Sequence, residues 1–324
     1  MVSGTTNTLI ATVMVGKAPN GIAFDPDNGD VYVANAYCGT FFTDCGMGNV
    51  SVIDSSTNTV TATVPVGRDP EHVAFDPVNG DVYVSNGYNG TISIIDGSTN
   101  TVISTITTGG YPEGMAFDSL NGDMYVANDG TASVSVIDGS TNTVITSLNV
   151  GPCLWADAFD SSNGDIYVGS QCGNPPFAGI VYVIDGSTNT VTASFSVNSI
   201  MYAIAFDISD GDIYVPTIGS GVQPEVAVID GNTNSVASTM TIGLENSGEI
   251  SAAYDPANGD LYVGAGGLGP IVSVFSTVQA STLTSTWIRC SGANTLVVFP
   301  SSCSETVWML RVVYRFMDTV INLI

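Results

Sequence analysis

Residues 116–147 read AFDSLNGDMYVANDGTASVSVIDGSTNTVITS, and most of the chain is this unit copied with loops of different length. Together with the residues just before it, the unit holds four short runs that alternate apolar and polar side chains or are rich in Val, Ile and Thr. Such runs are typical of strands. The predicted strands, named A to D in chain order, cover 113–117, 123–127, 133–137 and 143–148.

The segments between strands A and B and between strands C and D predict tight turns. They read DSLNG at 118–122 and DGSTN at 138–142. Asp and Asn side chains bond to the nearby backbone, and Gly takes a positive φ at little cost. Strand A is therefore expected to pair with B, and C with D, as antiparallel hairpins.

Both turns recur along the chain. The A–B turn occurs six times, with spacings of 51, 42, 42, 47 and 48 residues, starting at Asp25, Asp76, Asp118, Asp160, Asp207 and Asp255. The C–D turn starts at Asp54, Asp96, Asp138, Asp185 and Asp230. Four strands in each repeat of this length predict an all-β fold, a β-propeller of four-stranded antiparallel blades. A ring of blades is one domain, so we expect a single domain over 1–324 with regular repeats over 5–288.

The two ends of the chain bear on how the ring closes. Residues 5–15, TTNTLIATVMV, align with the D strand at 57–66, TNTVTATVPV. A leading D strand has no A, B and C strands before it, so we expect it to complete the last blade and close the ring. Residues 295–299, 306–310 and 313–317 then form the A, B and C strands of a degenerate seventh blade. The alternative is six blades followed by a tail at 289–324; we favour seven.

The charge balance limits the partners. The chain has 5 Lys and Arg against 30 Asp and Glu, a net charge of −25, and 17 of the acids are turn aspartates. Nucleic acid and anionic membrane surfaces require clustered basic residues, so we expect neither as a partner. No apolar run of 18 residues exists, which argues against membrane insertion. The N-terminus, MVSGTTNT, lacks the charged and apolar regions of a signal peptide.

Six cysteines fall into three local pairs. Cys38 and Cys45 share one loop, and Cys153 and Cys172 flank an A–B hairpin, so we predict both disulfides and an oxidising compartment; free thiols are the alternative. Cys290–Cys303 is a third candidate, but an A strand would separate its two residues in the seven-blade interpretation, at a span well beyond disulfide reach. A metal centre is not expected, because the sequence has no CxxC and His72 is the only histidine.

The motifs GDVYVAN at 29–35, GDVYVSN at 80–86 and GDMYVAN at 122–128, followed by SVID and STNTV, resemble the YVTN-type β-propeller repeat of archaeal surface-layer proteins. The resemblance covers about residues 5–276. It implies seven blades, export to the cell surface, and a role in envelope layers or adhesion. The resemblance identifies no catalytic residue, because a fold does not define a function.

Loop lengths point to one face of the ring as a recognition surface. All A–B and C–D turns project from one face and all B–C and D–A loops from the other, and the long insertions at 36–49, 171–179 and 216–224 are B–C loops. The D–A loops lead to the central channel, where we predict equivalent positions four residues before the A-strand aromatic. The candidate ligand-binding residues there are Asn20, Glu71, Glu113, Trp155 and Tyr202, with Ile250 in the sixth repeat and His72 beside Glu71.

Two functional hypotheses follow. The first is a non-enzymatic extracellular or cell-surface module, structural or adhesive, that binds a protein, a glycan or copies of itself through the B–C and D–A face. The second is a propeller hydrolase or lyase, similar to lactonases, that uses Glu71 and Glu113 as a general base or as ligands of a cation. No cofactor is expected under the first hypothesis; Ca²⁺ or another divalent ion at the mouth is the alternative, and a solvated mouth requires no ligand.

Overall fold

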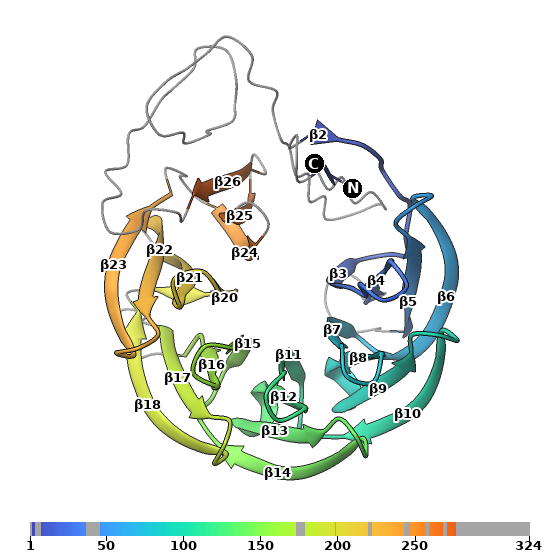
Figure 1. Ribbon diagram of the computed structural model, residues 1–324, viewed down its shortest axis with the longest axis horizontal. Helices are drawn as coiled ribbons and strands as arrows, with labels where there is room; N and C mark the ends of the chain where they lie inside the picture. The colour runs from blue at the N-terminus through green and yellow to red at the C-terminus, as the bar shows by residue number, and fades with distance from the viewer. Residues whose placement is uncertain are drawn as a thin grey trace.

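A computed structural model describes residues 2–3, 8–36, 46–172, 179–197, 199–219, 222–242, 247–256, 259–267 and 271–276. Its sheets stand around a ring like the blades of a propeller, with the first strand of each sheet toward the centre and, in the first five sheets, the last strand at the outer rim (Figure 1). The all-β propeller fold predicted from the repeat is therefore confirmed.

The first four blades are antiparallel sheets whose strand order follows the chain. They consist of β3 (Pro19–Phe24), β4 (Asp30–Asn35), β5 (Met47–Asp54) and β6 (Thr59–Arg68); β7 (Pro70–Asp76), β8 (Asp81–Asn86), β9 (Thr91–Asp96) and β10 (Thr101–Thr107); β11 (Pro112–Asp118), β12 (Asp123–Asn128), β13 (Ser133–Asp138) and β14 (Thr143–Asn149); and β15 (Leu154–Asp160), β16 (Asp165–Ser170), β17 (Gly179–Asp185) and β18 (Thr190–Val197). Short 3₁₀ turns, η1 (Gly87–Asn89) and η2 (Asp129–Thr131), occupy the B–C loops of the second and third blades.

The fifth and sixth blades are less regular. In the fifth, the A strand is split into β19 (Ile200–Met201) and β20 (Ala205–Phe206), which both pair with β21 (Asp212–Gly219), followed by β22 (Val222–Asp230) and β23 (Ser235–Thr241). The insertion predicted at 216–224 is largely an extension of this β21–β22 hairpin, because the pairing continues to Gly219 and Val222. The sixth blade has three described strands, β24 (Ser247–Asp255), β25 (Asp260–Gly267) and β26 (Ile271–Ser276).

The described chain forms six blades, not the seven that we favoured. The described strands end with β26 at Ser276, and the runs predicted for a seventh blade, at 295–299, 306–310 and 313–317, lie outside the described residues. Those runs lack the NGD turn that marks the other repeats, so the number of blades was poorly determined by the sequence pattern.

The N-terminal segment also differs from the prediction. Within the described residues, β2 (Thr8–Leu9) pairs with β1 (Val2–Ser3) as a separate two-stranded sheet, and it does not pair with the sixth blade. The expected completion of the last blade by this strand is therefore not observed in the described residues; instead, Val13 and Val15 pack against buried residues of β4 and β5 in the first blade. This contact resembles the way Val64 and Val66 of β6 pack against the second blade.

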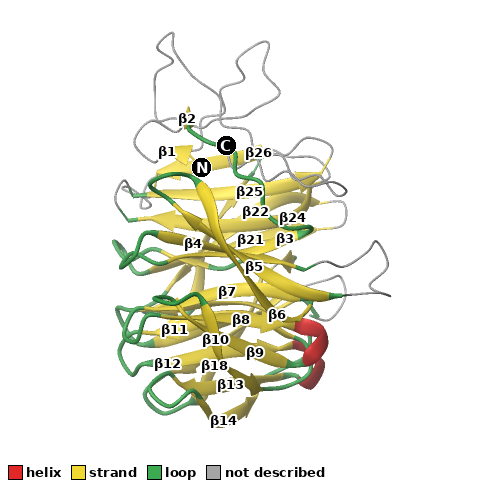
Figure 2. Ribbon diagram, turned by 90° about the vertical axis from the view of Figure 1, so that its right-hand side faces the viewer, coloured by secondary structure: helices red, strands yellow, loops and turns green. Residues whose placement is uncertain are grey.

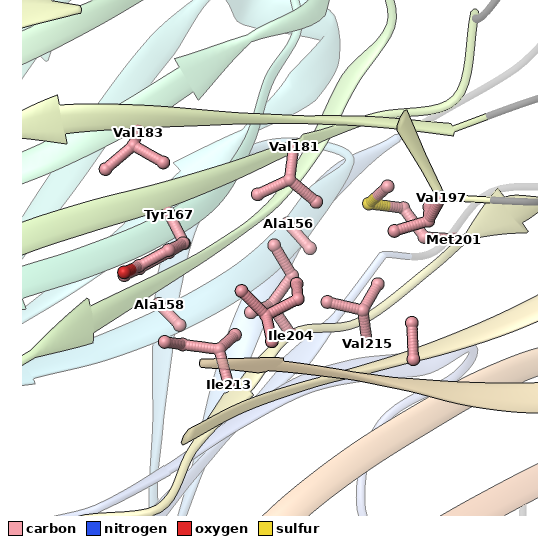
Figure 3. Packing of buried hydrophobic residues seen from close by; sticks show 12 residues of the cluster. Ala156, Ala158, Tyr167, Val181, Val183, Val197, Met201, Ile204, Ile213 and Val215 are labelled. Atoms are coloured by element: carbon pink, nitrogen blue, oxygen red, sulfur yellow. The ribbon is translucent and has the colours of Figure 1, made fainter. Parts of the chain in front are cut away.

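Apolar side chains between successive sheets form the core. Figure 3 shows the cluster between the fourth and fifth blades, where Tyr167 and Val183 face Ile204 and Ile213. Similar clusters lie between all other successive blades from the first to the sixth. The second to fifth sheets therefore bury both faces against their neighbours, as a radial repeat requires.

The repeated motif also joins the blades by hydrogen bonds on the turn face. Inside each turn, the aspartate caps the backbone: Asp118 Oδ1 accepts from the Leu120 N–H at 2.8 Å. Between blades, the buried B-strand tyrosines donate to the carbonyl of a glycine in the next C–D turn, from Tyr32 to Gly97 and from Tyr125 to Gly186, each at 3.2 Å. The GDxYV motif therefore encodes contacts between blades as well as a turn.

Candidate ligand-binding mouth

The predicted channel positions lie at the start of the innermost strands, on the face that carries the B–C and D–A loops. Figure 2 shows η1 and η2 on one side of the ring, away from the A–B and C–D turns. Asn20, Glu71, Glu113 and Trp155 occupy the second position of β3, β7, β11 and β15, and Tyr202 follows β19. Ile250 has the equivalent place in β24. We call Asn20, Glu71, Glu113, Trp155 and Tyr202 the channel mouth.

Neighbouring members of the channel mouth contact each other. The Asn20 amide donates a hydrogen bond to Glu71 Oε2. On the following blades, the rings of Trp155 and Tyr202 meet edge to face, with centroids 6.1 Å apart and planes at 87°. The mouth therefore has a polar part on the first three blades and an aromatic part on the fourth and fifth.

Glu113 is the most perturbed group of the polar part. Only 5 % of the residue is exposed, and its Oε2 atom is buried with no hydrogen-bond partner among the described residues. Burial, followed by the charges of Glu71, Asp129 and Asp69 in that order, raises the pKa of Glu113 to about 9. Because this pKa lies above neutrality, Glu113 is expected to be protonated at pH 7.

Two of these acids, Asp69 and Asp129, were not among the predicted site residues. Asp69 is buried, and burial raises its pKa while a hydrogen bond with Glu71 lowers it. Burial also raises the pKa of Asp129 in η2. Asp69 could have been found by aligning the repeats, because it occupies the same position as Ala18, Tyr111 and Cys153. All four residues have a positive φ, and the carbonyl of each accepts a hydrogen bond from the backbone N–H just after a B strand.

His72 has a different environment from the acids. It takes the A-strand position where the neighbouring blades have Gly21 and Gly114, whose ideal Cβ atoms would lie within 3 Å of the adjacent A strand's backbone. Its backbone N–H donates to Ser85 Oγ at 2.9 Å, and desolvation lowers its pKa to about 4. His72 is thus expected to be neutral at pH 7 and to act as a spacer between the second and third blades.

The residues that the structure describes contain no group of three or more His, Cys, Asp and Glu side chains that could hold a metal ion. The aspartates of the first A–B turn bond within the turn instead: Asp25 Oδ1 accepts a hydrogen bond from the Asp27 N–H at 2.8 Å, as is usual for a tight turn.

Another acid with a buried carboxyl, Asp157, lies between the third and fourth blades. Both of its carboxylate oxygens are buried without a hydrogen-bond partner among the described residues. Burial raises its pKa well above the usual range, and the nearby backbone of Ala127 lowers it only in part. The equivalent residues of the neighbouring blades are apolar, as Val73 and Met115 show, so a column-by-column comparison of the repeats could have identified Asp157.

One of the predicted disulfides is confirmed. Cys153 and Cys172 are bonded across the mouth end of the β15–β16 hairpin, with their Cα atoms 5.5 Å apart. The other two predicted pairs, Cys38–Cys45 and Cys290–Cys303, lie outside the described residues.

In the part of the chain that is described, no helix is both long and apolar enough to cross a membrane.

Two exposed aromatic side chains lie on the same face as the acids. Tyr88 in η1 and Tyr111 in the following D–A loop are 50 % and 46 % exposed. The guanidinium of Arg68 stands over the Tyr88 ring, 5.7 Å from its centroid. The face that carries the mouth therefore combines carboxylates with accessible aromatic rings.

Comparison with known proteins supports the fold and leaves the function open. No protein-family profile matches the chain, and no curated protein matches it. Among solved structures 1430 chains match, so this likeness singles out no activity. One of them is the hydrazine synthase of Kuenenia stuttgartiensis, with 18 % sequence identity, a TM-score of 0.67, and coverage of 87 % of this chain and 84 % of that one.

Proposed function

We propose that this propeller is a non-enzymatic binding module of a cell surface or extracellular assembly. The observation that carries the proposal is the channel mouth, where the Asn20–Glu71 pair and Glu113 share one rim with the Trp155–Tyr202 pair. Polar acceptors beside aromatic faces are a common arrangement in ligand sites, because the aromatic rings provide contact area and the polar groups provide specificity.

Extracellular placement is supported by the Cys153–Cys172 disulfide, since such bonds persist in oxidising compartments. The repeat motifs that resemble YVTN-type surface-layer proteins point the same way. The net charge of −25 disfavours nucleic acid and anionic lipid as partners. Under this proposal the chain contributes a structural or adhesive element that contacts a glycan or protein.

A glycan is the first ligand to test, because sugar rings stack on aromatic side chains and sugar hydroxyls donate to carboxylates and amides. The experiment is binding of the purified chain to a glycan array, with the variants Trp155→Ala and Tyr202→Ala. The matched control is Leu120→Ala, because Leu120 is 67 % exposed on the opposite, turn-bearing face. We expect the two mouth variants to lose binding at least tenfold and the control to keep it. Equal binding by all three variants would refute a role for the mouth.

A hydrolase or lyase is the second candidate, favoured by one observation: a carboxyl with a pKa of about 9 beside Glu71 has the protonation state of a general acid. The discriminating assay is turnover of a panel of lactones and esters. Activity that disappears in both Glu71→Gln and Glu113→Gln would replace the binding proposal.

A further inference from the structure

The further inference concerns four acids between the second and third blades, which we call the acidic cluster: Asp69, Glu71, Glu113 and Asp129. Asp69 precedes β7, Glu71 and Glu113 stand near the start of β7 and β11, and Asp129 begins η2. Glu71 Cγ and the Asp69 carbonyl oxygen lie 3.4 Å and 3.5 Å from one point, an ideal Cβ built on Gly87. In agreement with this geometry, the charges of Glu71, Asp129 and Asp69 all raise the pKa of Glu113.

The cluster has an unused acceptor at its centre. Glu113 is 95 % buried, and its Oε2 atom has no hydrogen-bond donor among the described residues. A buried oxygen without a donor costs free energy, and three nearby acids increase the cost of charging it. A positively charged hydrogen-bond donor would satisfy the oxygen and offset the repulsion.

The geometry argues against a simple metal ion as that donor. A metal requires several ligands at once within about 2.6 Å of one point, and no such group of three exists in the described residues. An organic cation reaches its partners through separate N–H groups at longer donor–acceptor distances, so it tolerates a wider spacing of carboxylates.

Aromatic rings beside the cluster fit an organic cation as well. An ideal Cβ built on Gly87 would lie 3.4 Å from Glu71 Cγ and 3.7 Å from the Tyr111 ring, so these two side chains flank one point. Tyr111 is 46 % exposed, which leaves its ring accessible to a ligand. The contact of Arg68 with Tyr88 on the same face shows that a guanidinium finds a favourable ring there.

We propose that the acidic cluster and Tyr111 bind the ammonium or guanidinium group of an organic cation. The inference deepens the proposed function, because it rests on the same face of the ring and names the chemistry that its polar part recognises. It predicts that a ligand for this part of the mouth carries a protonated amine or a guanidinium.

Binding should release protons at neutral pH. Glu113, with a pKa of about 9, holds a proton that a bound cation would displace. The titratable groups that face it are Glu71, Asp69 and Asp129; His72 on β7 stays neutral because its pKa is about 4. Proton release therefore comes from the carboxyls of the cluster.

The test is isothermal titration calorimetry of the full chain at pH 7 with putrescine, and with 1,4-butanediol as the neutral isostere. Agmatine, which carries both groups, tests the guanidinium. We expect saturable binding of putrescine or agmatine, none of butanediol, and a heat that depends on the ionisation enthalpy of the buffer. Raising the salt concentration should weaken the binding, since the attraction is electrostatic.

Two variants localise the site. Glu113→Gln is expected to weaken cation binding at least tenfold, and Asp129→Asn, on the partly exposed η2, provides a second measurement if Glu113→Gln fails to fold. Glu225→Gln, a partly exposed residue of β22, is the matched control and should leave the dissociation constant unchanged.

Three results would overturn the inference: butanediol binding as well as putrescine, Ca²⁺ binding without either amine, or unchanged amine binding in the folded Glu113→Gln variant. Failure of this inference can be told apart from failure of the proposed function, because Trp155→Ala and Tyr202→Ala test the aromatic part of the mouth in a separate assay.

Discussion

The substitution Glu113→Gln should make the stability of the protein less sensitive to alkaline pH. Glu113 has a pKa of about 9 in the folded chain, against a reference value of 4.5. Between these values the folded state keeps a proton that the unfolded state has lost. Its contribution to stability is thus fully present below pH 4.5 and is lost as the pH rises toward 9.

The magnitude follows from the linkage relation. Each pH unit in this window lowers the free energy of unfolding by about 1.4 kcal/mol, so three units between pH 5 and pH 8 amount to at most about 4 kcal/mol. Glutamine has no such proton, and the stability difference between Glu113→Gln and the parent should therefore grow in favour of the variant as the pH rises.

Urea unfolding at pH 5, 6, 7 and 8, followed by tryptophan fluorescence, measures this difference directly. Glu225→Gln is the matched control, and its effect should stay within about 0.5 kcal/mol, as is usual for surface changes. A Glu113→Gln difference that is flat from pH 5 to pH 8 would refute the assigned environment of Glu113.

Three further predictions concern contacts that define the fold. Removing the disulfide by Cys153→Ala with Cys172→Ala should lower the free energy of unfolding by about 3 kcal/mol, because the bond closes a loop with a sequence separation of 19; an unchanged urea midpoint would contradict this. Tyr125→Phe removes the hydroxyl bonded to Gly186 and Asn189 and should cost about 1–3 kcal/mol, whereas Tyr214→Phe, whose hydroxyl has no partner among the described residues, should cost less than about 0.5 kcal/mol in the same melts. Asp157→Leu should stabilise the chain at pH 8 more than at pH 4, since burial raises the Asp157 pKa and its neighbours in the repeat are apolar; a loss of stability at pH 8 in thermal melts would count against the carboxyl being unpaired.

The parts of the fold that could be read from the sequence are those encoded within one repeat. The turn at Asp118, the alternation of 123–127 and the flanking cysteines Cys153 and Cys172 are local patterns, because a strand period and a tight turn depend on residues near in sequence. The mouth positions were also predictable once the repeats were aligned, since equivalent residues of a ring occupy equivalent places.

The remaining features depend on what surrounds a residue in space. Asp157 and Asp69 are ordinary acids in the sequence, and only packing between blades buries them. The N-terminal segment aligns with a D strand, yet β2 pairs with β1, because the choice of pairing partner depends on which edge is available. Blade number likewise could not be fixed from residues beyond 276, which carry no turn motif.

The most direct test of the account is a crystal structure of the chain with a ligand identified on the glycan array or by calorimetry. The account predicts ligand density at the mouth, touching Trp155 or Tyr202 for a stacked ring and the acidic cluster for a cationic group. Density on the opposite face, beside the A–B and C–D turns, would contradict it.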